Sequence, residues 1–388
     1  MATPVALGGR GRLWHARGVM KRATAAFFAL VWLPAAACGG GGAAAPPTPT
    51  PDSAVVPDDT GGVGPTDATD ADGGVVADDV APDSASPADA AADAGASGPA
   101  VCAGGYGEPV ALGALDTGVV AEASGLAVSR LTPGVVWTHN DSGDGPVLYA
   151  LGAAGTLRAT ATVRGVAAVD WEDLAAARCP GGAGACLWVA DVGDNLRRRS
   201  DSAVLVVREP RLAEPATPGA PEVLELDLAW RFPVSWPEKR RDSEALLVAP
   251  EGDRFWLIAK ADEATAGVYG HPGPLTSAAS AVLEHVVDLP SPGLTIPKGR
   301  MVTGADLHPT GSRLLVRTYT GVFEYRLDGP LHLSELATLE PVVVVWGPLT
   351  EPQGEAVSYD AAGTGVLTLS EDPRGEGHQP LHHYPCLP

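Results

Sequence analysis

Short apolar runs separated by Gly, Pro, Asn and Asp dominate the second half of the chain, a pattern typical of β-strands joined by tight turns. No stretch has sustained helical periodicity, so we expect few helices. The pattern recurs: Val169–Asn195 holds a Glu-Asp pair, an apolar strand, a hairpin and a second strand. Similar stretches start at Glu244 and Gln353 and, more weakly, at Ser124 and Thr303.

Repeats spaced by roughly 50 residues, each with about four short strands, predict an all-β fold of the β-propeller type. The predicted strands group into repeats at 125–163, 173–230, 245–289, 305–346 and 356–384. The last repeat is one strand short, and an isolated strand at Glu108–Leu115 would complete it. We therefore expect five four-stranded blades, with the N-terminal strand closing the last blade. Six blades are the alternative, because the interval from Glu172 to Glu244 is long enough to hold another.

The N-terminal residues 1–37 have the features of a signal peptide. Arg17, Lys21 and Arg22 precede an apolar run at 25–33 that is too short to span a membrane. Residues 33–38 resemble a bacterial lipobox, which implies lipidation at Cys38, whereas ordinary signal cleavage is the alternative. Met20 is a second candidate start. We expect an exported protein held in the cell envelope, with its membrane contact made through the lipid anchor.

Residues 38–101 consist mainly of Gly, Ala, Pro, Thr and Asp and contain no aromatic residue, Lys or Arg. Such a segment has too little apolar bulk to fold, so we predict a disordered acidic tether before a propeller domain at 102–388. The whole chain has a net charge of −21. An acidic surface repels nucleic acid and favours bound cations, or cationic or neutral ligands. We expect a monomer with no nucleic-acid partner.

Five cysteines are an odd number for an exported protein unless one is lipidated. With Cys38 set aside, four remain. Cys179 and Cys186 flank the turn of one predicted hairpin and can join its strands. Cys102 and Cys386 lie at the two ends of the folded region, where a disulfide would hold a closed ring together.

Polar residues gather at the starts of the first strands and the ends of the second strands, which an antiparallel hairpin brings to the same face. Clustered carboxylates there favour a hard cation with oxygen ligands, and calcium is the candidate for an exported protein. The predicted metal ligands are Glu172, Asp173, Glu244, Glu355, Asp191 and Asp194. The predicted residues for a small-molecule or peptide ligand are Asn140, Asp141, Asn195, Lys260, Arg317 and Glu371.

Structural explanations compete with each of these assignments. The loops around Asn140 and Asp194 have the composition of tight β-turns, and a glutamate at a strand start could cap amides or pair with Lys260 or Arg317. The occurrence of Glu at the same point of three repeats favours a site. His139 is a solvated side chain or a catalytic base, and the histidines at 378, 382 and 383 form an exposed tail or a zinc site.

The segments VADVGDN, DSEALLVAP and QGEAVSY, with WTHNDSGDGPVLYAL, VDWEDLA and VTGADLHPTG, resemble an exported bacterial β-propeller family related to phytase-like, esterase-like and lactonase-like propellers. The resemblance implies either a calcium-dependent hydrolase or a binding protein. The leading hypothesis is an envelope lipoprotein that binds a divalent cation and a small ligand or peptide. The alternatives are a calcium-dependent phosphoesterase or lactonase, in which Lys260 and Arg317 steer an anion, and a non-catalytic scaffold.

Overall fold

The computed structural model describes residues 102–388 except 116–117, 142, 153, 214–219, 261–263, 276–280, 297, 347–350, 352 and 373–378. These residues belong to the second of two compact units, Ser84–Pro388. The predicted signal peptide (1–37), the tether (38–101), Cys38 and the histidine at 378 lie outside the described residues and remain predictions. Within the described ranges, no helix is long and apolar enough to cross a membrane.

The regular secondary structure of the described residues is β-strand, as predicted, apart from one short 3-10 helix, η1 (Leu333–Thr338). The first half contains β1 (Val110–Ala114), β2 (Ala123–Val128), β3 (Val135–Asn140), β4 (Val147–Gly152), β5 (Leu157–Arg164), β6 (Trp171–Arg178), β7 (Ala185–Asp191), β8 (Ala203–Arg208) and β9 (Glu222–Ser235). The second half contains β10 (Ser243–Val248), β11 (Phe255–Ala259), β12 (Thr265–Gly270), β13 (Ala281–Val282), β14 (Glu284–Pro290), β15 (Val302–Leu307), β16 (Arg313–Thr318), β17 (Gly321–Arg326), β18 (Val342–Trp346), β19 (Gly354–Tyr359), β20 (Val366–Ser370) and β21 (Pro380–Tyr384).

The strands form antiparallel groups of four. Three are separate sheets with the orders β10-β11-β12-β14, β15-β16-β17-β18 and β1-β21-β20-β19. The other two groups, β2-β3-β4-β5 and β6-β7-β8-β9, are joined into one larger sheet because the outer strands β5 and β9 pair in parallel. The short strand β13 also pairs with β9, at its C-terminal end.

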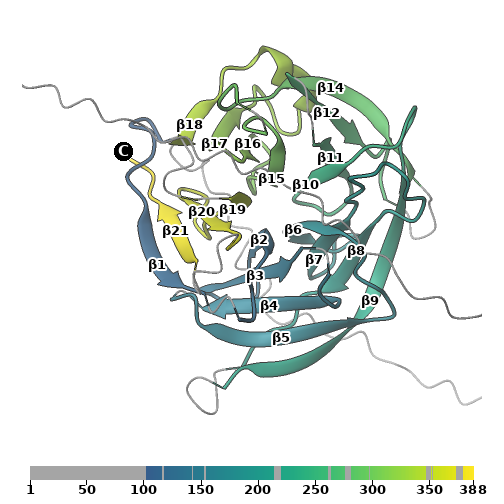
Figure 1. Cartoon of the computed structure of the whole chain (residues 1–388), viewed down its shortest axis with the longest axis vertical. Helices are drawn as coiled ribbons and strands as arrows, with labels where there is room; N and C mark the ends of the chain where they lie inside the picture. Colours follow the sequence, from purple (N-terminus) through teal and green to yellow (C-terminus); the bar gives the residue numbers. More distant parts are fainter. Residues whose placement is uncertain are drawn as a thin grey trace, which may run out of the picture. The chain divides into compact units, whose positions relative to one another are not determined.

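One strand of each group, the inner strand, lies near a common centre (Figure 1); the inner strands are β2, β6, β10, β15 and β19. Their contacts form a closed cycle, from β2 to β6, β10, β15, β19 and back to β2. Radial repetition of four-stranded antiparallel sheets around a central axis is the arrangement of a β-propeller, so the prediction of an all-β, propeller-like fold is confirmed.

The N-terminal strand closes the ring as the sequence predicts. Strand β1 pairs antiparallel with β21, with Val110 opposite His383. The Cys102–Cys386 disulfide lies beside this pair, and Cys179–Cys186 joins the two strands of the β6–β7 hairpin. Both predicted pairings are confirmed, and two disulfides fit a protein exported to an oxidising compartment.

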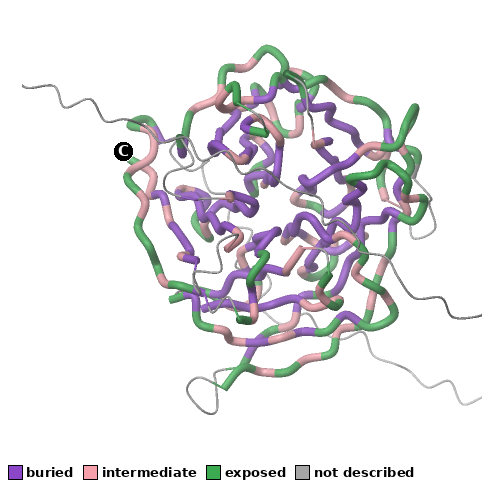
Figure 2. Tube along the Cα trace, in the orientation of Figure 1, coloured by how far each residue is buried: buried purple, intermediate pink, exposed green. Residues whose placement is uncertain are grey.

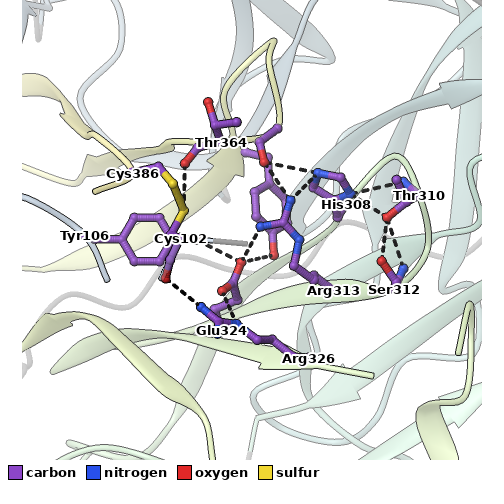
Figure 3. A network of polar contacts seen from close by, with 12 residues as sticks. Cys102, Tyr106, His308, Thr310, Ser312, Arg313, Glu324, Arg326, Thr364 and Cys386 are labelled. Carbon is purple, nitrogen blue, oxygen red and sulfur yellow. Dashed lines mark hydrogen bonds and ion pairs between the residues drawn. A yellow bond between two sulfur atoms is a disulfide. The ribbon is translucent and has the colours of Figure 1, made fainter. Parts of the chain in front are cut away.

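A buried carboxylate reinforces the closure (Figure 3). Glu324, on β17, is fully buried. Its oxygens accept hydrogen bonds from Tyr106 (2.8 Å), Tyr359 (3.2 Å), Arg313 (3.2 Å) and Arg326 (3.1 Å). Arg326 also donates to the Cys102 carbonyl at 3.1 Å. The segment that precedes β1 is therefore held to a neighbouring sheet as well as to the residues that follow β21.

Burial decreases from the inner strands to the outer ones (Figure 2). Strands β10 and β19 are buried at every position, whereas β9 alternates between half-buried and exposed residues along most of its length. Inner strands are covered on both faces by neighbouring sheets, so they lack the alternation of polar and apolar residues that marks a strand with one solvated face. Trp137, Trp171 and Trp188 are among the largest fully buried side chains.

Candidate metal centre

Each inner strand has a register irregularity near its first residues. The shift occurs between residues 123 and 126 in β2, 171 and 173 in β6, 243 and 245 in β10, 302 and 304 in β15, and 354 and 356 in β19. A β-bulge re-aims the side chain of the extra residue. In three strands that residue is a glutamate: Glu172, Glu244 and Glu355. The three predicted glutamates therefore have equivalent positions on β6, β10 and β19.

Glu172 lies at the centre of two carboxylate groups. One group contains Asp141, Asp170 and Glu172, and the other contains Glu172, Asp242 and Glu244. Within each group, one oxygen from every residue lies within 4.8 Å of the others. Calcium binds oxygen at about 2.3–2.6 Å, so two oxygens on opposite sides of one ion are roughly 5 Å apart. Both groups are compact enough to hold a cation.

Asp170 and Asp242 are not among the predicted ligands, although the repeats contain a signal for them. Each precedes a bulge glutamate by two residues, as Asp170-Trp171-Glu172 and Asp242-Ser243-Glu244. The β19 repeat has Gln353 at the same offset from Glu355. Asp242 is also fixed by its neighbours, because its Oδ1 accepts a hydrogen bond from the Asp194 amide at 2.8 Å.

Gly193, in the loop after β7, allows the first carboxylate group to form. A Cβ atom at Gly193 would overlap the carboxylates of both Glu172 and Asp170. Its amide donates a hydrogen bond to the Asp170 carbonyl at 3.2 Å, which holds the loop against the start of β6. A residue without a side chain is needed where backbone approaches the carboxylates this closely.

Lys260 and its partners lie beside the second carboxylate group. Lys260 forms an ion pair with Glu244, and its Nζ lies 5.5 Å from the centre of the Tyr319 ring. Gln353 donates a hydrogen bond to Glu371. We refer to this cluster of carboxylates as the acidic mouth, which comprises Asp141, Asp170, Glu172, Asp242, Glu244, Glu355 and Glu371.

Burial and mutual repulsion perturb these carboxyl groups. Burial and then the charge of Asp141 raise the pKa of Asp170 to about 6 and raise the pKa of Glu172 well above its usual value. Burial followed by the charge of Glu371 raises the pKa of Glu355. The ammonium group of Lys260 opposes the rise at Glu172 and Glu355. The acidic mouth therefore holds more carboxyl groups than Lys260 can keep ionised at neutral pH.

The carboxylate of Asp173, another predicted ligand, is occupied by the backbone. Its Oδ1 accepts the Leu174 amide at 2.8 Å, and its Oδ2 accepts the amides of Leu246 at 2.7 Å and Ala305 at 3.2 Å. These donors belong to β6, β10 and β15, so one fully buried side chain links three inner strands. Burial raises the pKa of Asp173, while the three amides act in the opposite direction.

The predicted metal ligands at the end of β7 and in the following loop contact groups of that same loop. Asp191 forms an ion pair with Arg199 at 2.8 Å. The carboxylate of Asp194 accepts the amides of Arg198 at 2.7 Å and Arg199 at 2.9 Å. Asn195 is exposed. The structure thus places these side chains at the edge of the acidic mouth, with the two aspartates serving as turn and loop partners.

Among the predicted ligand-binding residues, Asp141 and Glu371 belong to the acidic mouth, and Lys260 pairs with Glu244 there. Two others have partners in the fold. Asn140 accepts the Glu122 amide at 3.1 Å and donates to Asp144 at 2.8 Å. Arg317 forms a buried ion pair with Glu351.

The candidate histidines are also built into the fold. His139 is fully buried, and burial lowers its pKa to about 4. His382 lies 3.3 Å from Glu351, and His383 lies 3.1 Å from Asp360. These two histidines therefore contact different carboxylates, and in the described part of the chain neither belongs to a group with metal-ligand spacing.

No protein-family model matches the chain, and no curated protein matches its sequence. Solved structures that resemble it include a gluconolactonase from Xanthomonas campestris, with 13% identity over 71% of this chain and 89% of that chain and a TM-score of 0.35. The WD40 repeats of RRP9 are 10% identical over 68% and 67% of the two chains (TM-score 0.34), and a protein from Lactobacillus plantarum is 10% identical over 69% and 85% (TM-score 0.35). At these identities the similarities assign neither a substrate nor a reaction to this chain.

Proposed function

We propose that the acidic mouth binds a divalent cation, with calcium as the physiological candidate. The observation that carries the proposal is the pair of carboxylate groups that share Glu172. Hard cations such as calcium take several carboxylate oxygens from a flexible set of ligands. The proposed ligands are Asp141, Asp170, Glu172, Asp242 and Glu244. Gly193 supports this assignment, because the space that its missing side chain leaves is occupied by two of the carboxylates.

The electrostatics of the mouth favour a bound cation. Burial raises the pKa values of Glu172 and Asp170, so ionising them without a counter-charge is unfavourable. A divalent cation reverses that preference, because it stabilises the ionised carboxylates. Lys260 supplies one positive charge beside Glu244. Cation binding is therefore expected to release protons and to stabilise the ends of the inner strands.

The same proposal places a small ligand or peptide beside the cation, over Glu355, Glu371, Lys260 and Tyr319. In this proposal the fold is a propeller of five blades, and Cys38 carries the lipid that anchors it in the cell envelope. The proposed cation would then be held at the mouth of the channel, where an approaching ligand reaches it.

A hydrolytic role is the second candidate, and one observation favours it. The pKa of Glu355 is raised by burial and by Glu371, so this side chain can hold a proton near neutral pH. A protonated carboxyl beside a cation can act as a general acid in cleavage of a phosphoester or lactone. A non-catalytic scaffold is the remaining alternative.

Thermal unfolding of the full chain with calcium or with a chelator tests the cation site. We expect calcium to raise the Tm of the wild type and of Asp227→Asn, an exposed carboxylate on β9 that pairs with Arg164. Glu172→Gln removes the shared ligand and should abolish the calcium-dependent shift. An equal shift in Glu172→Gln and the wild type would remove Glu172 from the site.

Turnover of phosphoester and lactone panels separates the enzyme from the binding protein. The hydrolytic candidate requires calcium-dependent turnover that Glu355→Gln lowers by roughly 10²-fold or more, the range of general acid catalysis. Calcium binding without turnover supports the binding protein. A chain with neither property retains only the scaffold role.

A further inference from the structure

A cavity of about 570 Å³ lies near the ends of the inner strands that are opposite the acidic mouth. Strand β6 shows the separation: Glu172 is near its first residue, and Arg178 is its last. Six residues of extended chain cover roughly 20 Å. The cavity also borders the last residues of β2, β15 and β19. It is therefore distinct from the proposed cation site.

Three arginines line this cavity although the whole chain is strongly acidic: Arg130, Arg178 and Arg211. Arg178 lies 3.4 Å from Glu251, and Arg211 donates to the Leu131 carbonyl at 2.7 Å. Within the described ranges, no hydrogen bond or ion pair holds the guanidinium group of Arg130. Both Arg130 and Arg178 line the cavity, and burial and the charge of Arg178 lower the pKa of Arg130, while the charges of Glu209 and Glu251 act in the opposite direction.

The acidic side chains that line the cavity are already engaged. Asp306 accepts the Tyr359 amide at 2.8 Å and the Ser358 hydroxyl at 3.0 Å. Asp360 accepts backbone amides of the following turn and lies 3.1 Å from His383. Their lone pairs therefore serve the strand ends, and the counter-charges nearest the arginines are those of Glu209 and Glu251.

We propose that this cavity binds a small organic anion through Arg130 and Arg178. Guanidinium groups bind carboxylate and phosphate oxygens with two parallel hydrogen bonds, and an anion between two arginines also relieves their repulsion. Apolar side chains, including Leu131, Pro133, Leu307 and Pro309, form another part of the lining. The volume suits a small molecule, and the mixed lining suits one with both an anionic group and an apolar part.

Isothermal titration of the full chain tests the site with two probes, inorganic phosphate and benzoate, which separate the phosphate and carboxylate classes. A chelator is present throughout, so that no anion can bind through a cation at the acidic mouth. Arg130→Gln and Arg178→Gln are the test variants. The matched control is Arg164→Gln, an arginine on β5 with a half-exposed side chain that pairs with Glu225 and Asp227. Far-ultraviolet circular dichroism confirms that each variant is folded.

We expect the wild type and Arg164→Gln to bind at least one probe equally. Arg130→Gln should weaken binding by tenfold or more, because it removes a charge-assisted pair of hydrogen bonds. Arg130→Lys keeps the positive charge but lacks the planar guanidinium group that donates two parallel hydrogen bonds. It should therefore recover only part of the affinity that Arg130→Gln loses. Wild type that binds neither probe, or Arg130→Gln that binds as tightly as the control, would overturn the proposal. Glu172→Gln should bind the anion normally. A negative result for the cation site therefore leaves the anion-site proposal to be decided by the arginine variants.

Discussion

Replacement of Asp173 by alanine tests whether this buried carboxylate holds the inner ring together. The change removes the acceptor of three amides, which belong to Leu174, Leu246 and Ala305. The site is fully buried, so no solvent replaces the lost partner. Each buried donor left without an acceptor costs about 1–3 kcal/mol.

Three orphaned amides give a loss of roughly 3–9 kcal/mol. Burial raises the pKa of Asp173, which shows that the ionised side chain is itself poorly solvated, and its removal offsets part of this loss. We therefore expect Asp173→Ala to lower the free energy of unfolding by about 3 kcal/mol or more, a large part of the 5–15 kcal/mol typical of folded domains. The surface variant Asp227→Ala should change it by about 0.5 kcal/mol or less.

Urea unfolding followed by tryptophan fluorescence measures this loss, since Trp137, Trp171 and Trp188 are fully buried. A decrease below about 1 kcal/mol would show that the three amides find other partners and would refute the reasoning. The same variant separates the structural role of Asp173 from metal ligation. If the carboxylate serves the amides, folded Asp173→Ala retains calcium binding at low temperature, whereas loss of calcium binding would support its role as a ligand.

Further perturbations address closure, the acidic mouth and its pH dependence. Removal of the Cys102–Cys386 disulfide, whose cysteines have a sequence separation of 284, should destabilise the fold by roughly 5 kcal/mol. Removal of Cys179–Cys186, with a separation of 7, should cost about 2.5 kcal/mol, as chemical denaturation of the two double serine variants will show. Gly193→Ala should weaken calcium binding by tenfold or more in titration calorimetry, while Gly273→Ala, with open space around its Cβ position, should not. Burial raises the pKa of Asp170 to about 6 and that of Asp306 to about 7, so between about pH 4 and 7 these groups hold protons in the folded chain that the unfolded chain has lost. Without calcium, the Tm should therefore fall as the pH rises from about 4 to 7. Calcium binds the ionised form, so its stabilising effect should grow over the same interval, and a calcium effect that is equal at pH 5 and pH 8 would contradict the proposed ligands.

The local pattern predicts most of the fold because strand length, turn residues and repeat spacing are short-range features. The ring closure by the segment at 108–115 follows from counting strands, and both disulfides follow from where the cysteines lie in that count. The parallel pairing of β5 with β9 does not follow from it. That pairing depends on how far β9 extends beyond its own sheet, and outer strands with alternating exposure carry no sequence signal for a second partner.

The sequence predicts where the candidate site lies better than it predicts which residues form it. Repetition places Glu172, Glu244 and Glu355 at equivalent bulges, and this requires only the repeat alignment. Which carboxylates can take part in the site depends on the groups that surround each of them in the folded chain. Adjacent residues such as Glu172 and Asp173 point to different partners, and Asp194 is used by the amides of its own loop.

The two ends of the inner strands differ in chemistry, with carboxylates near their starts and arginines lining the cavity near their ends. At the starts, the bulges of β6 and β10 combine Asp-x-Glu motifs into shared carboxylate groups, while β2 and β15 have hydroxyl residues that bond to the next strand: Ser124 to the Glu172 carbonyl at 2.6 Å and Thr303 to the Gly354 carbonyl at 2.8 Å. The hydroxyls fix the ring without adding charge. The two compact carboxylate groups therefore lie at the starts of β6 and β10 and the end of β3, while Glu355 and Glu371 join the acidic mouth from β19 and the residue after β20.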